Sequence, residues 1–264
     1  MHPIERLRYV ARATGAPGDD VFREAVSSLA GFATDPMALV TACRRLVDRH
    51  PANGLIWWLC ARTLTAADPA DEAWRCLDEH VTDPTGRELA HALPDGGRVV
   101  VLGHPWRVGE GLARRGDLEV RVVDVVGDGP GFVRELAHAD VGSVDVPVTG
   151  LASAADTADV VLLEASAVGP ETAVCEPGSW ALAAVARTSG RPVWLTGGAG
   201  RMVPAGLWEP LVERLRGLTS DPWSAAQDLV PLGLVDRIVG PRGPVEVAAA
   251  VAAPDVPDVA DLRR

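Results

Sequence analysis

The sequence contains no lysine: all 25 basic residues of the 264-residue chain are arginine. Lysine forms Schiff bases with carbonyl substrates and supplies the phosphate-binding cation of the P-loop, and a guanidinium can take over neither role. The absence of lysine therefore excludes both chemistries. A GC-rich coding bias is the simplest origin of this composition, and it leaves the chemical consequence unchanged.

Cysteine and long apolar runs are also scarce. The four cysteines, Cys43, Cys60, Cys76 and Cys175, form no CxxC pair and no spacing that suits zinc, so we expect no metal site. The sequence shows no signal peptide and no apolar run of about 18 residues. We therefore expect a reduced, cytoplasmic protein without a membrane partner.

Positive charge is in deficit as well, because the formal net charge is −11 and the isoelectric point is about 5.0. These values argue against a general attraction to nucleic acid phosphates or to anionic membranes. A local group of arginines could still bind a small phosphate. The hydrophobic fraction of 47% and the charged fraction of 23% are those of a globular protein with a substantial core.

What is present falls into two parts, and the first, residues 1–93, has the periodicity of helices. Apolar residues recur at helical spacing in "VFREAVSSLAGFA" and "NGLIWWLCARTLTAA". The Asp-Pro pairs at Asp35 and Asp68 are typical helix starts, with aspartate as the N-cap and proline in the first turn. We predict an N-terminal domain of four or five helices with no strand.

The period changes in the second part, residues 94–256. Helical patterns there separate most of the Val- and Leu-rich runs "GRVVVLG", "LEVRVVDVVG", "SVDVPVTG", "ADVVLLEA" and "RPVWLTGG", and a sixth apolar segment, "LVPLGLVDRIVG", follows. Apolar strands separated by helices indicate a parallel sheet covered on both faces. We therefore predict an α/β fold, in which a Rossmann-like, doubly wound, mostly parallel sheet follows the helical N-terminal domain. Residues 257–264 are predicted to be a mobile tail.

Ligands of doubly wound sheets bind beyond the carboxyl ends of the strands, which selects a short set of candidate residues. Five loops converge there and predict a pocket. The candidates at these strand ends are His104, Arg107, Asp124, Thr149, Gly150, Glu164, Ser166, Gly198 and Arg201.

His104 and Asp124 each have a chemical and a structural interpretation. His104, with Arg107 nearby, could contact an anion or transfer a proton, but it could equally cap a helix or hydrogen-bond within its loop. Asp124 ends the second strand at a position that suits a ribose hydroxyl in dinucleotide folds. The segment "GHPWRVGEG" is not GxGxxG, however, so NAD and S-adenosylmethionine are disfavoured and we expect no cofactor.

The turn "TGGAGRMVP" could bind phosphate through its backbone amides, with the Arg201 guanidinium as a bidentate contact. It could equally be an ordinary turn after a strand. Glu171 and Cys175 precede the helix after the fourth strand. No histidine is near Cys175 in sequence, which disfavours this thiol as a nucleophile. Trp106 and Trp180 flank the expected pocket, where they could stack on a base or act as apolar lids.

Several segments follow one another in an order that is itself informative: "LAHALPDGGRVVVLGHPW", Asp124, "EASAVGPETAVCEPGSWALAAVA" and "DLVPLGLVDRIVGPRG". Over about residues 84–247 this order resembles the family that unites methylthioribose-1-phosphate isomerase, ribose-1,5-bisphosphate isomerase and the regulatory subunits of eukaryotic initiation factor 2B. The resemblance implies a homodimer formed through the C-terminal domain. It also implies a ligand that is a phosphorylated metabolite or nucleotide, or a protein partner.

The chain departs from this family where the isomerases carry their proton-transfer groups. The family has a cysteine after the first strand and an aspartate after the fourth, and Pro105 and Ser166 stand in those places. Proline cannot ionise, and a serine hydroxyl is too weak an acid to act without a base beside it. The family's Asn-Lys pair becomes Cys175-Glu176, which exchanges a cation for an anion.

Two classes of function follow from this comparison. Gly178 and Ser179 keep the small turn and the hydroxyl that open the helix, so they remain candidate ligand contacts. In the first class the protein is non-catalytic and binds a phosphorylated sugar or nucleotide, or a protein partner. In the second it is an aldose–ketose sugar-phosphate isomerase whose acid and base come from His104, Asp124, Glu164 or Glu171. Loss of both family proton-transfer residues favours the first class.

Overall fold

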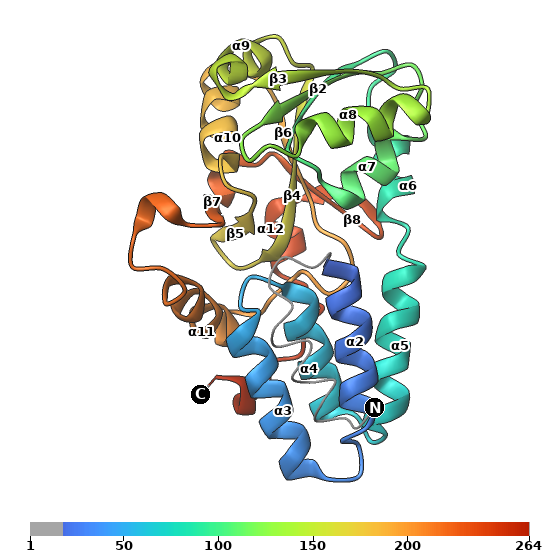
Figure 1. The fold of residues 1–264 in the computed structure, drawn as a ribbon, viewed down its shortest axis with the longest axis vertical. Helices are drawn as coiled ribbons and strands as arrows, with labels where there is room; N and C mark the ends of the chain where they lie inside the picture. Colours follow the sequence, from blue (N-terminus) through green and yellow to red (C-terminus); the bar gives the residue numbers. More distant parts are fainter. Residues whose placement is uncertain (1–17, 264) are drawn as a thin grey trace.

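The N-terminal part of the computed structural model, which describes residues 18–263, is helical as predicted (Figure 1). Residues 1–17 of the predicted helical domain lie outside the described residues. The helices are α2 (Gly18–Ala30), α3 (Pro36–Arg49), α4 (Gly54–Thr65), α5 (Pro69–Val81) and α6 (Thr85–Ala92). The Asp35 carboxylate accepts a hydrogen bond from Ala38 N–H at 3.0 Å, and Asp68 caps α5 in the same way. None of the helices within residues 18–263 has the length and apolar character that a membrane crossing requires.

The second part is built on a mostly parallel sheet, also as predicted. Within residues 18–263 its nine strands are β1 (Arg98–Leu102), β2 (Glu119–Asp124), β3 (Gly142–Pro147), β4 (Val160–Val168), β5 (Thr172–Cys175), β6 (Val193–Thr196), β7 (Asp228–Pro231), β8 (Arg237–Gly240) and β9 (Gly243–Glu246). The main path runs β3-β2-β1-β4-β6-β8-β9, and its pairs are parallel up to β8. The chain reverses direction across the sheet between β1 and β4, which is where such folds bind ligands at the carboxyl ends of their strands.

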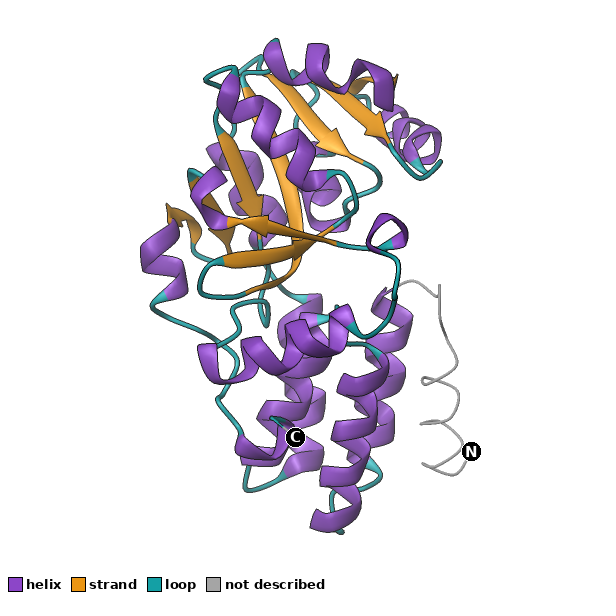
Figure 2. Ribbon diagram, turned by 90° about the vertical axis from the view of Figure 1, so that its left-hand side faces the viewer, coloured by secondary structure: helices purple, strands orange, loops and turns teal. Residues whose placement is uncertain are grey.

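Helices cover both faces of the sheet (Figure 2). One face carries α6, α7 (Trp106–Leu112) and α8 (Gly129–His138), and the other carries α9 (Leu151–Asp156), α10 (Ser179–Thr188) and α12 (Val247–Val251). Side chains of β1 alternate between the two layers: Val99 and Val101 pack in one cluster with Phe132 of α8, whereas Val100 packs with Leu182 of α10. Burial on both sides explains why the strands are almost continuously apolar.

The end of the fourth strand differs from the sequence prediction. The sequence predicts that this strand gives way to a polar loop after Ala165, but β4 continues to Val168 and pairs antiparallel with β5. The buried alanine and valine side chains of residues 165–168 favour this extension, and a register shift between Ala165 and Ala167 accommodates Ser166. The third strand ends at Pro147, so Thr149 and Gly150 follow it, as expected.

The C-terminal residues return to the helical domain. Helix α11 (Ala205–Arg216) packs there, and Figure 1 shows the chain end beside α3. Apolar side chains recur at every third residue of this segment, and all three of them, Val256, Val259 and Leu262, are buried in the core of the helical domain. The segment 257–264, for which the sequence predicts a mobile tail, therefore has a packed position in its described part.

Helix α4 begins directly against β4, and the contact depends on Gly54. A Cβ atom built on Gly54 would overlap the backbone carbonyl oxygen of Ser166 and would lie 3.3 Å from the Cα atom of Ala167. The obstacle is backbone, so no side-chain rotation can relieve it. Only glycine allows the helical domain to approach the sheet this closely.

We predict that Gly54→Ala lowers the free energy of unfolding by about 1–3 kcal/mol, because the methyl group forces α4 away from β4. Gly131→Ala in α8 is the matched control, since its new Cβ atom would have only a distal atom of Arg134 near it, at 4.0 Å. This control should be neutral or stabilising by up to about 1 kcal/mol, owing to the higher helix propensity of alanine. Urea denaturation measures both values, and equal effects would contradict the prediction.

Candidate functional site

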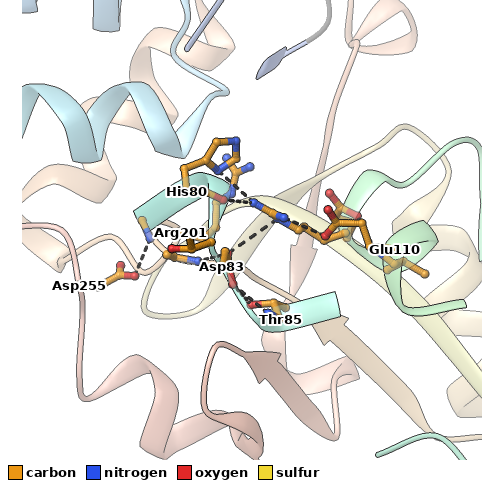
Figure 3. Close-up of polar contacts among 12 residues, drawn as sticks. His80, Asp83, Thr85, Glu110, Arg201 and Asp255 are labelled. Carbon is orange, nitrogen blue, oxygen red and sulfur yellow. Dashed lines mark hydrogen bonds and ion pairs between the residues drawn. The ribbon is translucent and has the colours of Figure 1, made fainter. Parts of the chain in front are cut away.

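The carboxyl ends of β1, β4 and β6 meet the helical domain, and charged side chains gather at this junction (Figure 3). We call this group the interdomain network and define it by Asp83, Arg107, Glu164, Ser166 and Arg201. Asp83 comes from the connection between α5 and α6, and the other four come from the sheet domain. The structure thus brings together four of the predicted site residues, along with one that was not predicted.

Arg107 is buried and its guanidinium reaches into the helical domain. Its Nη1 donates to Glu110 Oε2 at 2.8 Å, and its Nη2 donates to the backbone carbonyl of His80 at the end of α5. The Asp83 carboxylate lies 3.8 Å from the Arg107 Nε atom. A buried guanidinium with these partners joins the two domains, so Arg107 has a structural role in addition to the predicted anion contact.

Asp83 is the buried counter-charge in this network. One of its oxygens accepts hydrogen bonds from Thr85 N–H at 2.9 Å and from the Thr85 hydroxyl at 2.6 Å, and the other accepts from Ala199 N–H at 2.8 Å. Ala199 belongs to the Gly-rich loop after β6. Asp83 therefore ties the connection between the domains to the Gly-rich loop, for which the sequence left open either phosphate binding or an ordinary turn.

Glu164 lies on β4 and accepts a hydrogen bond from Val108 N–H, at the start of α7, at 3.1 Å. Burial raises the pKa of the Glu164 carboxyl, and the Val108 hydrogen bond and the positive charges of Arg201 and Arg107 only partly oppose this effect. A carboxyl group with a raised pKa can exchange a proton closer to neutral pH than an exposed one. Glu164 is the strongest acid–base candidate of the network.

The backbone amides of the Gly-rich loop are used within the chain. Gly200 N–H donates to Asp255 Oδ2 at 2.7 Å, and Met202 N–H donates to Asp255 Oδ1 at 2.9 Å. Together with the Ala199 amide on Asp83, these contacts give the loop the form of an anion-binding nest. The anions that this nest holds are two aspartates of the same chain. A Cβ atom built on Gly198 would overlap the Asp83 carboxylate and lie 3.7 Å from Arg107 Nε, so the loop packs closely against both residues.

The start of α10 is arranged in the same way. Gly178 has a φ of 94° and precedes the helix, and its N–H donates to Asp228 Oδ2 at 3.0 Å. The N–H of Trp180 donates to the same oxygen at 2.9 Å, and Ser179 between them is buried. Free N–H groups and the helix dipole stabilise an anion at this position. Here that anion is the carboxylate of Asp228, from β7.

The other residues of the β4–β5 hairpin have structural surroundings. The Ser166 hydroxyl donates to the carbonyl of Val174 at 3.2 Å, and the Ser166 carbonyl accepts from Arg201 Nη1 at 3.1 Å. Burial raises the pKa of the Cys175 thiol, which keeps it protonated and unreactive. Glu171 is exposed on the turn of the hairpin.

The remaining predicted acid–base residues, His104 and Asp124, have partners other than Glu164. His104 Nε2 lies 2.8 Å from Glu135 Oε2 of α8, and its ring contacts the ring of Phe132 at 4.9 Å between centroids. Asp124 Oδ1 accepts from the N–H of Gly127 in its own loop at 2.6 Å. Both side chains thus have partners on the α8 side of the sheet.

Three aspartates that shape the site, Asp83, Asp228 and Asp255, are absent from the sequence prediction. Asp83 carries a usable signal, because it precedes a proline as Asp35 and Asp68 do. Asp228 and Asp255 carry no local signal, because the amides that they bind lie 48 to 55 residues away in the chain.

The arrangement defines an α/β protein in which a helical domain closes the carboxyl ends of a Rossmann-like sheet. This is the fold of the family that contains the initiation factor 2B subunits and methylthioribose-1-phosphate isomerase. The chain superposes on eIF2B beta from Chaetomium thermophilum with a TM-score of 0.76 at 17% identity, over 98% of this chain and 91% of that one. The resemblance predicted from the sequence is thus confirmed for the fold.

Two further structures agree. The translation initiation factor eIF-2B of Pyrococcus horikoshii has a TM-score of 0.76 at 13% identity, covering 94% of this chain and 98% of that one. The 5-methylthioribose 1-phosphate isomerase of the same organism has a TM-score of 0.65 at 15% identity, covering 95% and 86%. No family model and no curated protein matches the sequence. At these identities the comparison establishes the fold and leaves the activity to the site.

We predict that Glu164→Gln changes the pH dependence of stability. A carboxyl whose pKa is raised by folding stabilises the native state fully below its unfolded pKa, and this contribution is lost as pH rises through the folded pKa. Glutamine does not titrate, so the unfolding free energy of the wild type should fall relative to the variant as pH rises from about 4 to 8. The exposed Glu171→Gln is the control, and parallel wild-type and Glu164→Gln profiles in urea denaturation would contradict the prediction.

Proposed function

We propose that this chain is a non-catalytic relative of the sugar-phosphate isomerases and initiation factor 2B subunits, and that it acts by binding. The observation that carries the proposal is that carboxylates of the chain itself, those of Asp83, Asp228 and Asp255, hold backbone N–H groups at the strand ends. A phosphorylated substrate would need N–H groups of this kind as its anion site. In addition, Pro105 and Ser166 stand where the resemblance places the proton-transfer residues.

A protein partner is the ligand class that these features favour over a phosphorylated sugar or nucleotide. Large apolar side chains follow the carboxyl ends of three strands, and Trp106, Val126 and Trp180 are each at least 51% exposed. Aromatic side chains are enriched at protein interfaces, where their area is buried at low entropic cost. The net charge of −11 points the same way, because it disfavours metabolites that carry a doubly charged phosphate.

Self-association is part of the same proposal. A structure similar to this chain, with a TM-score of 0.75 at 16% identity, is a tetrameric eIF2B-beta2-delta2 complex from C. thermophilum. By analogy, we propose that this chain forms a homodimer through the sheet domain, which we place at residues 94–256.

One observation favours a second function, that of an aldose–ketose sugar-phosphate isomerase. Glu164 has a raised pKa and lies at the strand ends with the positive charges of Arg107 and Arg201 near it. Such a carboxyl could move a proton between neighbouring carbon atoms of a sugar whose phosphate is held by an arginine. This candidate needs a second acid–base group, and His104 and Asp124 are engaged on the α8 side.

We predict no aldose-to-ketose conversion of ribose 1,5-bisphosphate or methylthioribose 1-phosphate by this protein, followed by NMR with an active isomerase as positive control. The expected failure follows from the lost family residues. Conversion that disappears in Glu164→Gln and persists in Glu171→Gln would establish the isomerase instead.

Light scattering of the same sample is expected to give twice the chain mass, and a monomeric mass would remove the homodimer from the proposal.

We also predict that Asp228→Ala opens an anion site at α10. The loss of its carboxylate leaves the N–H groups of Gly178 and Trp180 without their acceptor and should lower stability by about 0.5–2 kcal/mol. Inorganic phosphate should then raise the melting temperature of the variant more than that of the wild type. Asp48→Ala, which removes an exposed carboxylate paired with Arg214, is the control for the change in net charge. Equal phosphate effects on all three proteins would contradict the competition between Asp228 and an external anion.

A further inference from the structure

A cavity of about 470 Å³ lies next to the interdomain network, at the Gly-rich loop after β6 and the β8–β9 hairpin. It shares the Gly-rich loop residues 197–199 with that region, but the five residues that define the network do not line it. The volume falls within the range of small-molecule sites. The proposed function uses Asp255 and the loop amides but none of the apolar residues of this cavity, so the role of the apolar part is a separate question.

The inner wall of the cavity is apolar. Met202, Ile238 and Ala250 line it and are almost completely buried, and Val245 of β9 adds a partly buried face. These side chains offer no hydrogen bond, so the part of a ligand that contacts them must be hydrocarbon. The branched and small side chains at this wall suit an aliphatic chain.

The rim of the cavity carries an arginine that is free to bind. Strands β8 and β9 form a hairpin in which Gly240 pairs with Gly243, and Arg242 lies on the turn between them. Arg242 is exposed, and no hydrogen bond or ion pair joins its guanidinium to another residue in the described part of the chain. A guanidinium at the edge of an apolar cavity has the geometry for bidentate binding of a carboxylate.

Two carboxylates limit the charge of the ligand. Asp255 lines the cavity while its oxygens accept hydrogen bonds from Gly200 and Met202. Glu88 lies near the hairpin, with its Oε2 atom 3.7 Å from a Cβ position built on Gly243. Both carboxylates already have partners, Asp255 in these backbone N–H groups and Glu88 in the guanidinium of Arg87. The single guanidinium of Arg242 therefore suits a ligand with one negative charge, and the nearby carboxylates disfavour a phosphate dianion.

From these features we propose that the cavity binds a small aliphatic monocarboxylic acid, with its chain against Ile238, Val245 and Ala250 and its carboxylate on Arg242. Butanoate, pentanoate and hexanoate serve as probes in isothermal titration calorimetry with the full chain. The dissociation constant should fall by about fourfold for each added methylene, as expected for burial of hydrocarbon. Hexanamide, which lacks the charge, and hexyl phosphate, which carries more of it, should both bind more weakly than hexanoate.

Two variants test the assignment of the two ends of the ligand. Arg242→Gln should weaken hexanoate binding by about tenfold or more, whereas Arg237→Gln, an exposed arginine of β8 outside the cavity lining, should leave it unchanged. Ala253→Leu places a larger side chain at an exposed position of the wall and should block binding, whereas Ala249→Leu, exposed on α12 and outside the lining, should not. All four positions are exposed, so folded variants are expected and thermal unfolding checks this.

Three results would overturn the proposal: no saturable binding of hexanoate to the wild type, wild-type affinity in Arg242→Gln, or wild-type affinity in Ala253→Leu. Tighter binding of hexyl phosphate than of hexanoate would also overturn the monocarboxylate assignment. These outcomes are independent of the isomerase assay, because Glu164 does not line this cavity.

Discussion

Carboxylates that accept hydrogen bonds from backbone N–H groups hold the carboxyl ends of the strands in place. Glu164 accepts a hydrogen bond from the N–H at the start of α7, and Asp228 accepts one from the N–H before α10. Asp83 and Asp255 accept hydrogen bonds from N–H groups of the Gly-rich loop. A buried N–H group without an acceptor costs about 1–3 kcal/mol, so each turn depends on its carboxylate. The position of the helical domain depends on them too, because Asp83 is one of its links to the sheet.

The features that could be predicted from sequence are those with a local cause. Asp35 and Asp68 start their helices because an aspartate caps the turn that directly follows it, and the apolar runs become strands because both faces of the sheet are covered. The extension of β4 into the hairpin with β5 depends instead on pairing with β7, which lies more than fifty residues further on. The burial of Leu262 likewise depends on a core formed by the other end of the chain.

In the candidate site, too, features with a local cause could be predicted and those that depend on distant parts of the chain could not. Arg107, Glu164 and Arg201 lie at one junction, where their strand-end positions place them, because parallel strands end at one edge of the sheet. Strand-end position could not separate them from His104, whose partner Glu135 is on a helix, since the direction of a side chain is set by tertiary packing. For the same reason, the sequence could not predict that Asp83 and Asp255 accept hydrogen bonds from the Gly-rich loop. The fold is therefore that of the initiation factor 2B-like structures, while aspartates of the chain itself accept hydrogen bonds from the N–H groups at the strand ends.

The location of Asp83 has a consequence for domain motion. It lies in the short connection between α5 and α6, one of the segments that would have to act as a hinge if the helical domain swung away from the sheet. Hydrogen bonds to the Asp83 carboxylate hold that segment in place, from the Thr85 hydroxyl in its own turn and from Ala199 N–H across the junction. The junction is therefore expected to be rigid on the timescale of domain opening, and any molecule that enters it would have to fit the closed form rather than induce it.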